Sequence, residues 1–350
     1  MSPARGEMER VLIPGWSSCP ALAEGLGKVE AYLEEQLSTG HSLISDAVLS
    51  LLQAGGKRIR PALVLASGMF GRGYSASLVP IAAAIEIVHM ATLIHDDIID
   101  DADTRRGVRT IHARYGADVA VFTGDYLFTR AFQILSGYAS QDMLSSVARA
   151  VQEVCEGEIE QYEARHSTSV CFGQYLRRIR QKTAMLFGLS CYAGAIAAEA
   201  PGATADALRR FGMHLGIAFQ IVDDILDLSA DSAATGKPAG HDFVCGVYTL
   251  PVIYALGSDR WGEELRDLLV GPNGAGGGAG GAQSQSEDRG RIIERERILE
   301  IVRESGALGR ASKVAERYAA RARRCLAPLP GGAGKDILTG ILASAVHRSN

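Results

Sequence analysis

The sequence predicts an all-α protein built around a hydrophobic core. Apolar residues recur at intervals of three or four along most of the 350-residue chain, which is the spacing of one face of a helix. No stretch alternates between apolar and polar residues over the length of a strand. Hydrophobic residues make up 47% of the chain and charged residues 22%, so enough apolar surface is present for a large helical bundle.

The clearest predicted helix lies between Leu208 and Ile225, where the apolar residues share one face. Thr204 precedes this segment as a candidate N-cap, because its hydroxyl can accept a hydrogen bond from an unpaired amide of the first turn. The same spacing predicts helices over roughly residues 78–101, 115–137, 143–165 and 174–198, with shorter helices before and after them, about a dozen in all.

Two segments fall outside the helical pattern. Residues 1–22 contain prolines and charges, so we expect an irregular tail rather than a signal peptide. Residues 271–287 are rich in glycine, which loses the most backbone entropy on ordering, and we expect a flexible surface loop. A linker between domains is the alternative, but the charged segment 291–324 has too few large apolar residues for a second core. We therefore expect a single domain over residues 1–350.

The composition favours a cytoplasmic protein. The 36 basic and 40 acidic residues give a formal net charge of -4, which excludes a global positive field for nucleic acid. The 6 cysteines include no closely spaced pair, so neither a zinc site nor a redox motif is indicated and reduced thiols are expected. The longest apolar run, Met185 to Ala198, is shorter than the about twenty residues of a membrane-spanning helix. We expect no transmembrane segment.

Acidic residues crowd the end of the predicted helix over 78–101. Asp96, Asp97 and Asp100 form a DDxxD motif, and Asp101 and Asp103 follow at once. Asp96 and Asp100 lie one turn apart, and like charges at that spacing destabilise a helix unless a positive group lies beside them. Paired carboxylates suit Mg²⁺, which completes its octahedral shell with water and substrate phosphate. The alternative is an acidic helix end exposed to solvent.

A second DDxxD motif, formed by Asp223, Asp224 and Asp227, follows about 127 residues later on another apolar helix. Gln220 lies one turn before it and shares a stripe with Asp223 and Asp227, beside the apolar stripe of that helix. Two such motifs predict a clamp that holds one anion through metal ions. Because the motif occurs twice, a metal-binding role is favoured over an acidic helix end that is merely exposed to solvent.

Cationic residues suited to phosphate accompany the acidic motifs. The segment GGKRIRP presents Lys57, Arg58 and Arg60 after two glycines, and Arg105 and Arg106 directly follow the first DDxxD motif. Arginine offers a planar fork for phosphate oxygens, and lysine offers a point charge. The sequence therefore predicts two local phosphate sites on a chain that is acidic overall.

A histidine shares the face of the first acidic motif. His89, Thr92 and Asp96 follow one another at steps of three and four along the predicted helix, so their side chains point the same way. His89 is a candidate hydrogen-bond donor to a diphosphate. A satisfied core histidine is the alternative.

These motifs, in this order, resemble the trans-polyprenyl diphosphate synthase family, whose members join an allylic diphosphate to isopentenyl diphosphate. The resemblance covers about residues 40–256. It implies an all-α bundle of the isoprenoid synthase type with a central active-site cavity. Several segments are similar to the catalytic component, component II, of heptaprenyl diphosphate synthases: LLQAGGKRIRP, EIVHMATLIHDDIIDDADTRRG, VCEGEIEQ, YLRRIRQKTA, GKPAGHD and TLPVIYAL.

The resemblance also implies roles for single positions. Isopentenyl diphosphate would be held by basic residues, namely Lys57, Arg60, His89 and Arg106. The allylic diphosphate would be held by Arg105, Lys182, Thr183, Gln220 and Lys237. Two Mg²⁺ ions would bind at Asp96 and Asp100 and a third at Asp223 and Asp227. Lys182 and all the aspartates of both motifs, including Asp97 and Asp224, are candidate catalytic residues.

These residue types suit the reaction that the resemblance implies. Breaking the allylic carbon–oxygen bond leaves a carbocation and a diphosphate anion, so the barrier is mainly a separation of opposite charges. Cations in a closed, dry site lower this barrier, because Coulomb attraction grows as the effective dielectric constant falls. The isopentenyl double bond then attacks the cation, and loss of a proton gives an allylic product five carbons longer. The resemblance implies that the expelled pyrophosphate accepts this proton.

Product length depends on the residues just before the first acidic motif. Ala91 and Thr92 are too small to close a cavity there, and in the family small residues at these positions accompany long products. Small residues also suit close helix packing. We expect elongation of farnesyl diphosphate to heptaprenyl diphosphate, for the side chain of a respiratory quinone such as menaquinone. The product can partition into a membrane.

The resemblance leaves the assembly and some alternatives open. It implies a homodimer or a heterodimer with a small regulatory subunit. A homodimeric hexaprenyl or octaprenyl diphosphate synthase, or a geranylgeranyl diphosphate synthase, is the alternative within the class. A terpene cyclase would need no second diphosphate site such as GGKRIRP, and a non-catalytic interaction subunit of a prenyltransferase would need no DDxxD motifs.

Overall fold

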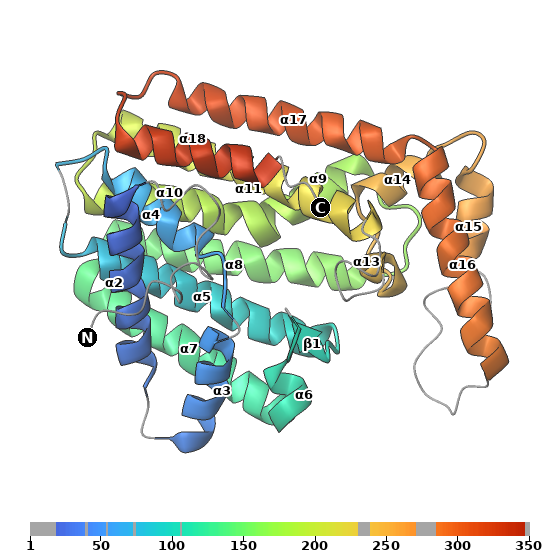
Figure 1. The fold of residues 1–350 in the computed structure, drawn as a ribbon, viewed down its shortest axis with the longest axis horizontal. Coiled ribbons are helices and arrows are strands. Elements are labelled where there is room, and N and C mark those ends of the chain that lie inside the picture. The colour runs from blue at the N-terminus through green and yellow to red at the C-terminus, as the bar shows by residue number, and fades with distance from the viewer. Residues whose placement is uncertain are drawn as a thin grey trace. The chain divides into compact units, whose positions relative to one another are not determined.

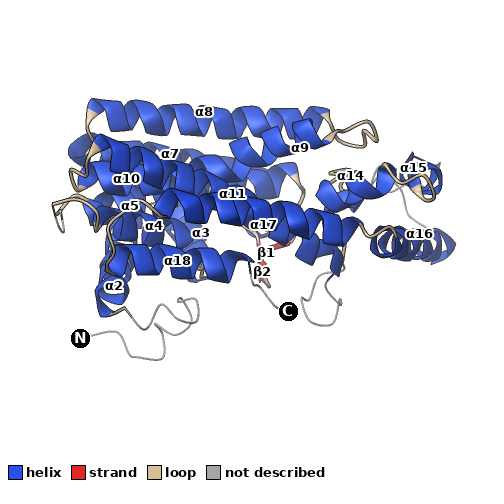
Figure 2. Cartoon of the chain, turned by 90° about the horizontal axis from the view of Figure 1, so that it is seen from above, coloured by secondary structure: helices blue, strands red, loops and turns tan. Residues whose placement is uncertain are grey.

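The computed structural model describes residues 19–38, 41–53, 55–72, 75–105, 107–229, 239–270 and 285–346. Nearly all regular structure in these ranges is helical, as Figure 2 shows. Within the same ranges the exception is a short hairpin in which β1 (Thr104–Arg105) pairs antiparallel with β2 (Val108–Arg109). The predicted all-α class is confirmed.

The chain forms two compact units. Unit 1 comprises Met1–Gln152, Met185–Met213 and Ala322–Ser344, and unit 2 comprises Glu153–Ala184, His214–Arg321 and Ala345–Asn350. The helices α8 (Gln141–Glu163), α11 (Gly202–Ser229) and α17 (Ala307–Leu326) contribute residues to both units. The expectation of a single domain stays a prediction.

Unit 1 is organised around α5 (Leu78–Ile99), which carries the first acidic motif (Figure 1). Its residues are almost all buried from Leu78 to Val88. The helices that pack against it are α2 (Pro20–Leu37), α4 (Ile59–Gly68), α7 (Ala117–Tyr138) and α10 (Met185–Ala197). The shorter α3 (Ser42–Gln53) and α6 (Ile111–Tyr115), and most of α18 (Ala333–Val346), also belong to unit 1.

Glycine allows the helices of unit 1 to approach backbone to backbone. A Cβ at Gly194 of α10 would lie 2.0 Å from the carbonyl oxygen of Val64 in α4, and one at Gly212 of α11 would lie 2.4 Å from that of Phe187 in α10. No side chain fits at such distances. At these positions α10 therefore lies close against α4 and against α11.

By length and composition alone, α5 could cross a membrane. A search for uninterrupted apolar runs does not find this helix, because Glu86 and His89 interrupt its apolar residues. In unit 1, 78% of its most apolar window is buried. The hydropathy of α5 is therefore that of a core helix.

Unit 2 has its own core. Its helices, besides parts of the shared ones, are α9 (Phe172–Ile179), the wide π-helical turn η2 (Arg180–Ala184), α13 (His241–Val244), α14 (Leu250–Leu256), α15 (Gly262–Val270) and α16 (Gln285–Glu304). Phe243, Tyr248, Leu265 and Ile301 are among the buried residues of this core. The charged segment predicted over 291–324 is divided between α16 and α17.

The observed helix boundaries differ from the expected ones at four places. The segment predicted as one helix over 174–198 is divided into α9, η2 and α10. Thr204 is not an N-cap, because α11 already begins at Gly202 and the carbonyl of Pro201 accepts the Thr204 amide at 2.8 Å. Helices α2 and α16 begin at Pro20 and Gln285, inside the expected tail and loop. Residues 1–18 and 271–284 lie outside the described ranges.

Candidate active site

The first acidic motif forms the C-terminal end of α5 in unit 1. Asp97 is 5% exposed, whereas Asp96 and Asp100 are partly exposed. The amide of Asp100 donates to the Asp96 carbonyl at 2.9 Å and ends the helix, and Asp101 then turns the chain with a positive φ of 48°. The two outer aspartates can therefore meet a ligand, while the middle one points into the protein.

Arg105 contacts the buried middle aspartate. Its Nε donates to Asp97 Oδ1 at 2.7 Å, and its side chain stays 34% exposed. The hydroxyl of Thr110 donates to the Ala102 carbonyl at 2.6 Å, which fixes the hairpin to the helix end. Asp97 thus orients a guanidinium whose remaining N–H groups can face a diphosphate. Arg106 lies outside the described residues.

The three cations of GGKRIRP take different positions in unit 1. Lys57 is exposed. The guanidinium of Arg60 lies over the Phe187 ring, 5.0 Å from its centre, a contact that favours the charged group electrostatically. Arg58 is buried and pairs with the carboxylates of two other helices. Solvent can therefore reach the side chains of Lys57 and Arg60, whereas Arg58 is buried.

The residues proposed to set product length lie on α5 before the motif. Ala91 is fully buried. The Thr92 hydroxyl donates to the His89 carbonyl at 2.8 Å, so its polar atom is satisfied within the helix. His89 itself is partly exposed. Neither Ala91 nor Thr92 presents a bulky group below Asp96.

The second acidic motif, on α11 in unit 2, repeats the burial pattern of the first. Asp223 is exposed and Asp227 is partly exposed, but Asp224 is 3% exposed. Asp224 accepts one hydrogen bond from the Tyr175 hydroxyl at 2.6 Å and another from Gln220 Nε2 at 2.8 Å. Burial raises the pKa of Asp224 to about 6, although both hydrogen bonds act to lower it.

Two predicted allylic-site residues extend this network. The hydroxyl of Thr183 donates to Gln220 Oε1 at 2.8 Å. Because the carboxylate of Asp224 can only accept from the Gln220 amide, the oxygen of Gln220 must face Thr183. Thr183 belongs to η2, and π-helical turns of this kind are frequent at functional sites. The structure thus brings Thr183, Gln220 and Asp224 together.

Lys182 also belongs to η2. Its Nζ lies 2.6 Å from Glu158 Oε1, and the two side chains are 23% and 15% exposed. The neighbouring basic residues Arg177 and Arg180 face acidic residues of α8 in the same way. The other predicted lysine of this site, Lys237, lies outside the described residues.

Asp242 is a candidate site residue that the sequence reasoning missed, although the segment GHD contains it. Burial and the neighbouring carboxylates, Asp227 first among them, raise its pKa well above the ordinary value. Burial also raises the pKa of Asp227, although hydrogen bonds from the backbone amides of Asp242 and His241 act to lower it. Asp227 Oδ2 is buried and has no hydrogen-bond partner among the described residues. Closely spaced carboxylates with an orphaned oxygen suit a cation.

The donor set fits a hard divalent metal ion. No group of three or more His, Cys, Asp or Glu side chains is preassembled as a metal site in the part of the chain that the structure describes. Mg²⁺ does not require one, since it binds through one or two carboxylates and takes its other ligands from water and phosphate. The outer aspartates of both motifs are suited to that role.

Two buried residues of unit 2 were also missed. Tyr175 is fully buried and donates to Asp224, and Arg178 is 7% exposed and donates to the Tyr248 carbonyl at 2.9 Å. No local pattern in the sequence indicates either contact, because the partners lie 49 and 70 residues away along the chain.

Comparison with known proteins tests the family that the sequence motifs indicated. The model of the polyprenyl synthetase family matches residues 41–273. Component 2 of the heptaprenyl diphosphate synthase of Geobacillus stearothermophilus is 38% identical, over 91% of this chain and 93% of its own. The nonaprenyl diphosphate synthase of Mycobacterium tuberculosis is 33% identical, over 94% of this chain and 93% of its own. Enzymes with products of different length are thus similar to this chain.

Solved structures show the same fold. The heptaprenyl diphosphate synthase of Staphylococcus aureus aligns with a TM-score of 0.84 at 30% identity, covering 94% of this chain and 99% of its own. A polyprenyl synthase of Caulobacter crescentus, solved with calcium and isoprenyl diphosphate, aligns with a TM-score of 0.83 at 32% identity, covering 93% and 95%. The family uses divalent metal ions to bind diphosphates. The chain belongs to the polyprenyl synthetase family and is a trans-polyprenyl diphosphate synthase.

Proposed function

We propose that this synthase elongates farnesyl diphosphate with isopentenyl diphosphate to heptaprenyl diphosphate, which supplies the side chain of a respiratory quinone such as menaquinone. The observation that carries the proposal is the pair of DDxxD motifs, each with a buried middle aspartate and outer aspartates that solvent can reach. The similarity to a heptaprenyl diphosphate synthase component supports the product. The nonaprenyl relative makes a longer product the second candidate.

The isopentenyl diphosphate site is proposed at Lys57, Arg60, His89 and Arg106. The described members of this set belong to unit 1. Lys57 supplies a point charge and Arg60 a planar fork, held in place by the Phe187 ring. His89 donates to a phosphate oxygen. None of these groups reacts, and their task is to hold the isopentenyl double bond toward the allylic carbon.

The allylic diphosphate site is proposed at Arg105, Lys182, Thr183, Gln220 and Lys237. Asp97 orients Arg105, and Asp224 with Tyr175 orients Gln220 and, through it, Thr183. We therefore assign Asp97 and Asp224 to positioning. Donors fixed before the reaction stabilise the diphosphate as its charge grows, because they need no reorganisation.

Asp96, Asp100, Asp223 and Asp227 would hold the Mg²⁺ ions, three for each active site. When bound, these ions neutralise the charge that develops on the leaving diphosphate. The clamp between the two motifs is part of the proposal. So are a cytoplasmic location and a dimer, either of this chain or with a small regulatory subunit.

The test incubates the purified chain with Mg²⁺, farnesyl diphosphate and labelled isopentenyl diphosphate, with and without a candidate small subunit. Chromatography of the products should show heptaprenyl diphosphate in at least one of the two conditions. A cyclic hydrocarbon would indicate a cyclase, and no turnover in either condition would indicate a non-catalytic subunit. Asp96→Asn should abolish turnover without loss of helicity. Asp206→Asn, an exposed aspartate on α11, is the matched control and should remain active.

The length assignment has its own variant. Thr92→Phe places an aromatic ring one turn before Asp96, where the present side chain only bonds to the helix backbone. Its products should be shorter than those of the wild-type chain. Unchanged product length in a folded variant would remove Thr92 from the proposed product-length determinants.

A further inference from the structure

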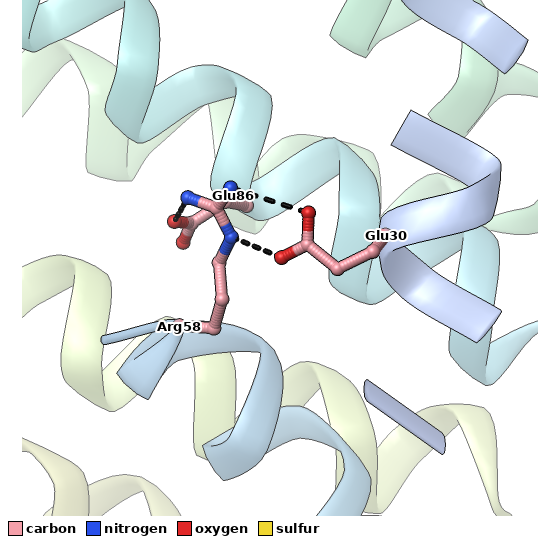
Figure 3. Close-up of polar contacts among 3 residues, drawn as sticks. All are labelled: Glu30, Arg58 and Glu86. Atoms are coloured by element: carbon pink, nitrogen blue, oxygen red, sulfur yellow. Dashed lines mark hydrogen bonds and ion pairs between the residues drawn. The ribbon is translucent and has the colours of Figure 1, made fainter. Parts of the chain in front are cut away.

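Buried charge lies beside the segment GGKRIRP in unit 1. Arg58 is 5% exposed. Its guanidinium grips the Glu30 carboxylate with two hydrogen bonds, from Nε to Oε1 and from Nη2 to Oε2 at 3.2 Å. A third runs from Nη1 to Glu86 Oε1 at 3.3 Å. Figure 3 shows the three side chains converging from separate segments of the chain. We call Arg58, Glu30 and Glu86 the buried triad.

The backbone of Arg58 is held in an unfavourable conformation. Its φ of 45° and ψ of 38° are left-handed, a region that residues with a Cβ avoid. Arg58 is the N-cap residue of α4, and its carbonyl accepts the amide of Ala62 at 3.0 Å. A strained residue persists only where its surroundings hold it in place. Here the grip on two carboxylates supplies that restraint.

Stability alone does not account for the triad. Two carboxylates face one guanidinium, and Glu86 Oε2 has no hydrogen-bond partner among the described residues. Removing such charges from water costs free energy that their pairing only partly returns, so apolar side chains of similar volume often stabilise a protein as well or better. What the ionic arrangement adds is a fixed geometry, since a planar fork bonded on both edges allows little motion.

The geometry that it fixes belongs to the proposed isopentenyl diphosphate site. Arg58 lies between Lys57 and Arg60 in the sequence, and Glu86 precedes His89 by three residues, about one turn, on α5. The triad therefore ties the cationic segment to the helix that carries the histidine. All of these residues lie in unit 1.

We propose that the buried triad is the positioning device of the isopentenyl diphosphate site, with Arg58 as the positioning residue that sets Lys57 and Arg60 against His89. This inference rests on the proposed function. Arg58 touches neither substrate, so its loss should change the binding of isopentenyl diphosphate while the allylic site stays as it is.

The test replaces the whole triad in the full chain with apolar side chains, as Arg58→Met/Glu30→Met/Glu86→Met. No unpaired charge is left behind, so we expect a Tm within about 5 °C of the wild-type value. The KM for isopentenyl diphosphate should rise at least about tenfold, while the KM for farnesyl diphosphate changes less than about twofold. The dissociation constant of isopentenyl diphosphate, measured by calorimetry, should rise by a similar factor.

Two further variants separate positioning from a general structural effect. Arg72→Met/Glu199→Met removes an exposed ion pair of unit 1, at 2.8 Å, and should change neither KM. Arg58→Lys keeps the charge without the fork and should recover only part of the affinity for isopentenyl diphosphate.

A folded triple variant that binds isopentenyl diphosphate like the wild type would overturn the proposal. If the triple variant fails to fold, Glu86→Gln decides, because it preserves the side-chain volume. An increase of at least about threefold in the dissociation constant is expected for it, and no change would refute the positioning role. A wild-type chain without turnover would count against the proposed function, and calorimetry would still test the triad.

Discussion

Replacing Tyr175 with phenylalanine tests the buried network behind the second acidic motif. The Tyr175 hydroxyl donates to Asp224 Oδ2 at 2.6 Å, and both residues are buried. Burial raises the pKa of Asp224 from its ordinary 3.8 to about 6, which corresponds to a cost of about 3 kcal/mol for carrying the ionised group at pH 8. Without the hydroxyl, the ionised carboxylate loses a charge-assisted hydrogen bond, worth about 1.5–3 kcal/mol.

The sign of the pH dependence follows from the direction of this shift. The folded protein holds the Asp224 proton more tightly than the unfolded chain does, so stability from this group is full below about pH 4 and is lost as the pH rises through about 6. Tyr175 opposes that loss by stabilising the ionised form. Tyr175→Phe should therefore destabilise the metal-free protein more at pH 8 than at pH 5. At pH 5 Asp224 is mostly protonated, so the hydrogen bond that the variant removes joins two neutral groups and is worth about 1 kcal/mol.

The assay is thermal unfolding followed by circular dichroism in the presence of a chelator, at pH 5 and pH 8. We expect Tyr175→Phe to lower Tm by about 3–6 °C at pH 8 and clearly less at pH 5. Tyr248→Phe is the matched control: Tyr248 is 1% exposed, but its hydroxyl has no hydrogen-bond partner among the described residues. Its removal should leave Tm unchanged or raise it. An equal loss for Tyr175→Phe at both pH values, or an equal loss in both variants, would refute the reasoning.

Three further variants or conditions probe the packing and the ligand sites. Gly194→Ala should destabilise the protein by about 3 kcal/mol in thermal or denaturant unfolding, because its Cβ would lie 2.0 Å from a backbone oxygen; Gly309→Ala, with open space around it, should not destabilise. Phe187→Leu should raise the KM for isopentenyl diphosphate about threefold to tenfold through loss of the Arg60 contact, and an unchanged KM would contradict that role. Because the pKa of Asp227 is raised, protons compete with the metal ion, so the Mg²⁺ concentration for half-maximal activity should decrease as the pH rises; a midpoint that stays constant or increases with pH would contradict this.

The acidic motifs show how far sequence reasoning reaches in this protein. Helical spacing placed Asp96 and Asp100 on one face and Asp223 and Asp227 on another, because that periodicity is a local property of the chain. It could not show that the middle aspartates, Asp97 and Asp224, are buried while the outer ones are reached by solvent. Asp224 is buried because Tyr175, 49 residues away, supplies its hydrogen bond, and no local pattern encodes such a partner.

The cationic segment shows the same division. Glycines followed by lysine and arginines indicated a phosphate site, and the type and order of these residues sufficed for that. Whether each cation faces outward or inward depends on what other helices place beside it. Glu30 and Glu86, each 28 residues from Arg58, draw it inward, and Asp242 became a candidate only when folding brought it to Asp227.

The sequence by itself determined the helical class, the two acidic motifs and the kinds of side chain available to bind diphosphate, because each depends on residues within a few turns of one another. The tertiary structure alone decided which charged groups are buried and which hold others in place: Asp97 with Arg105, Asp224 with Tyr175, and Arg58 with its two glutamates. The physical reason is that burial and pairing set the free energy of a charge, and both are fixed by neighbours that are distant in the chain.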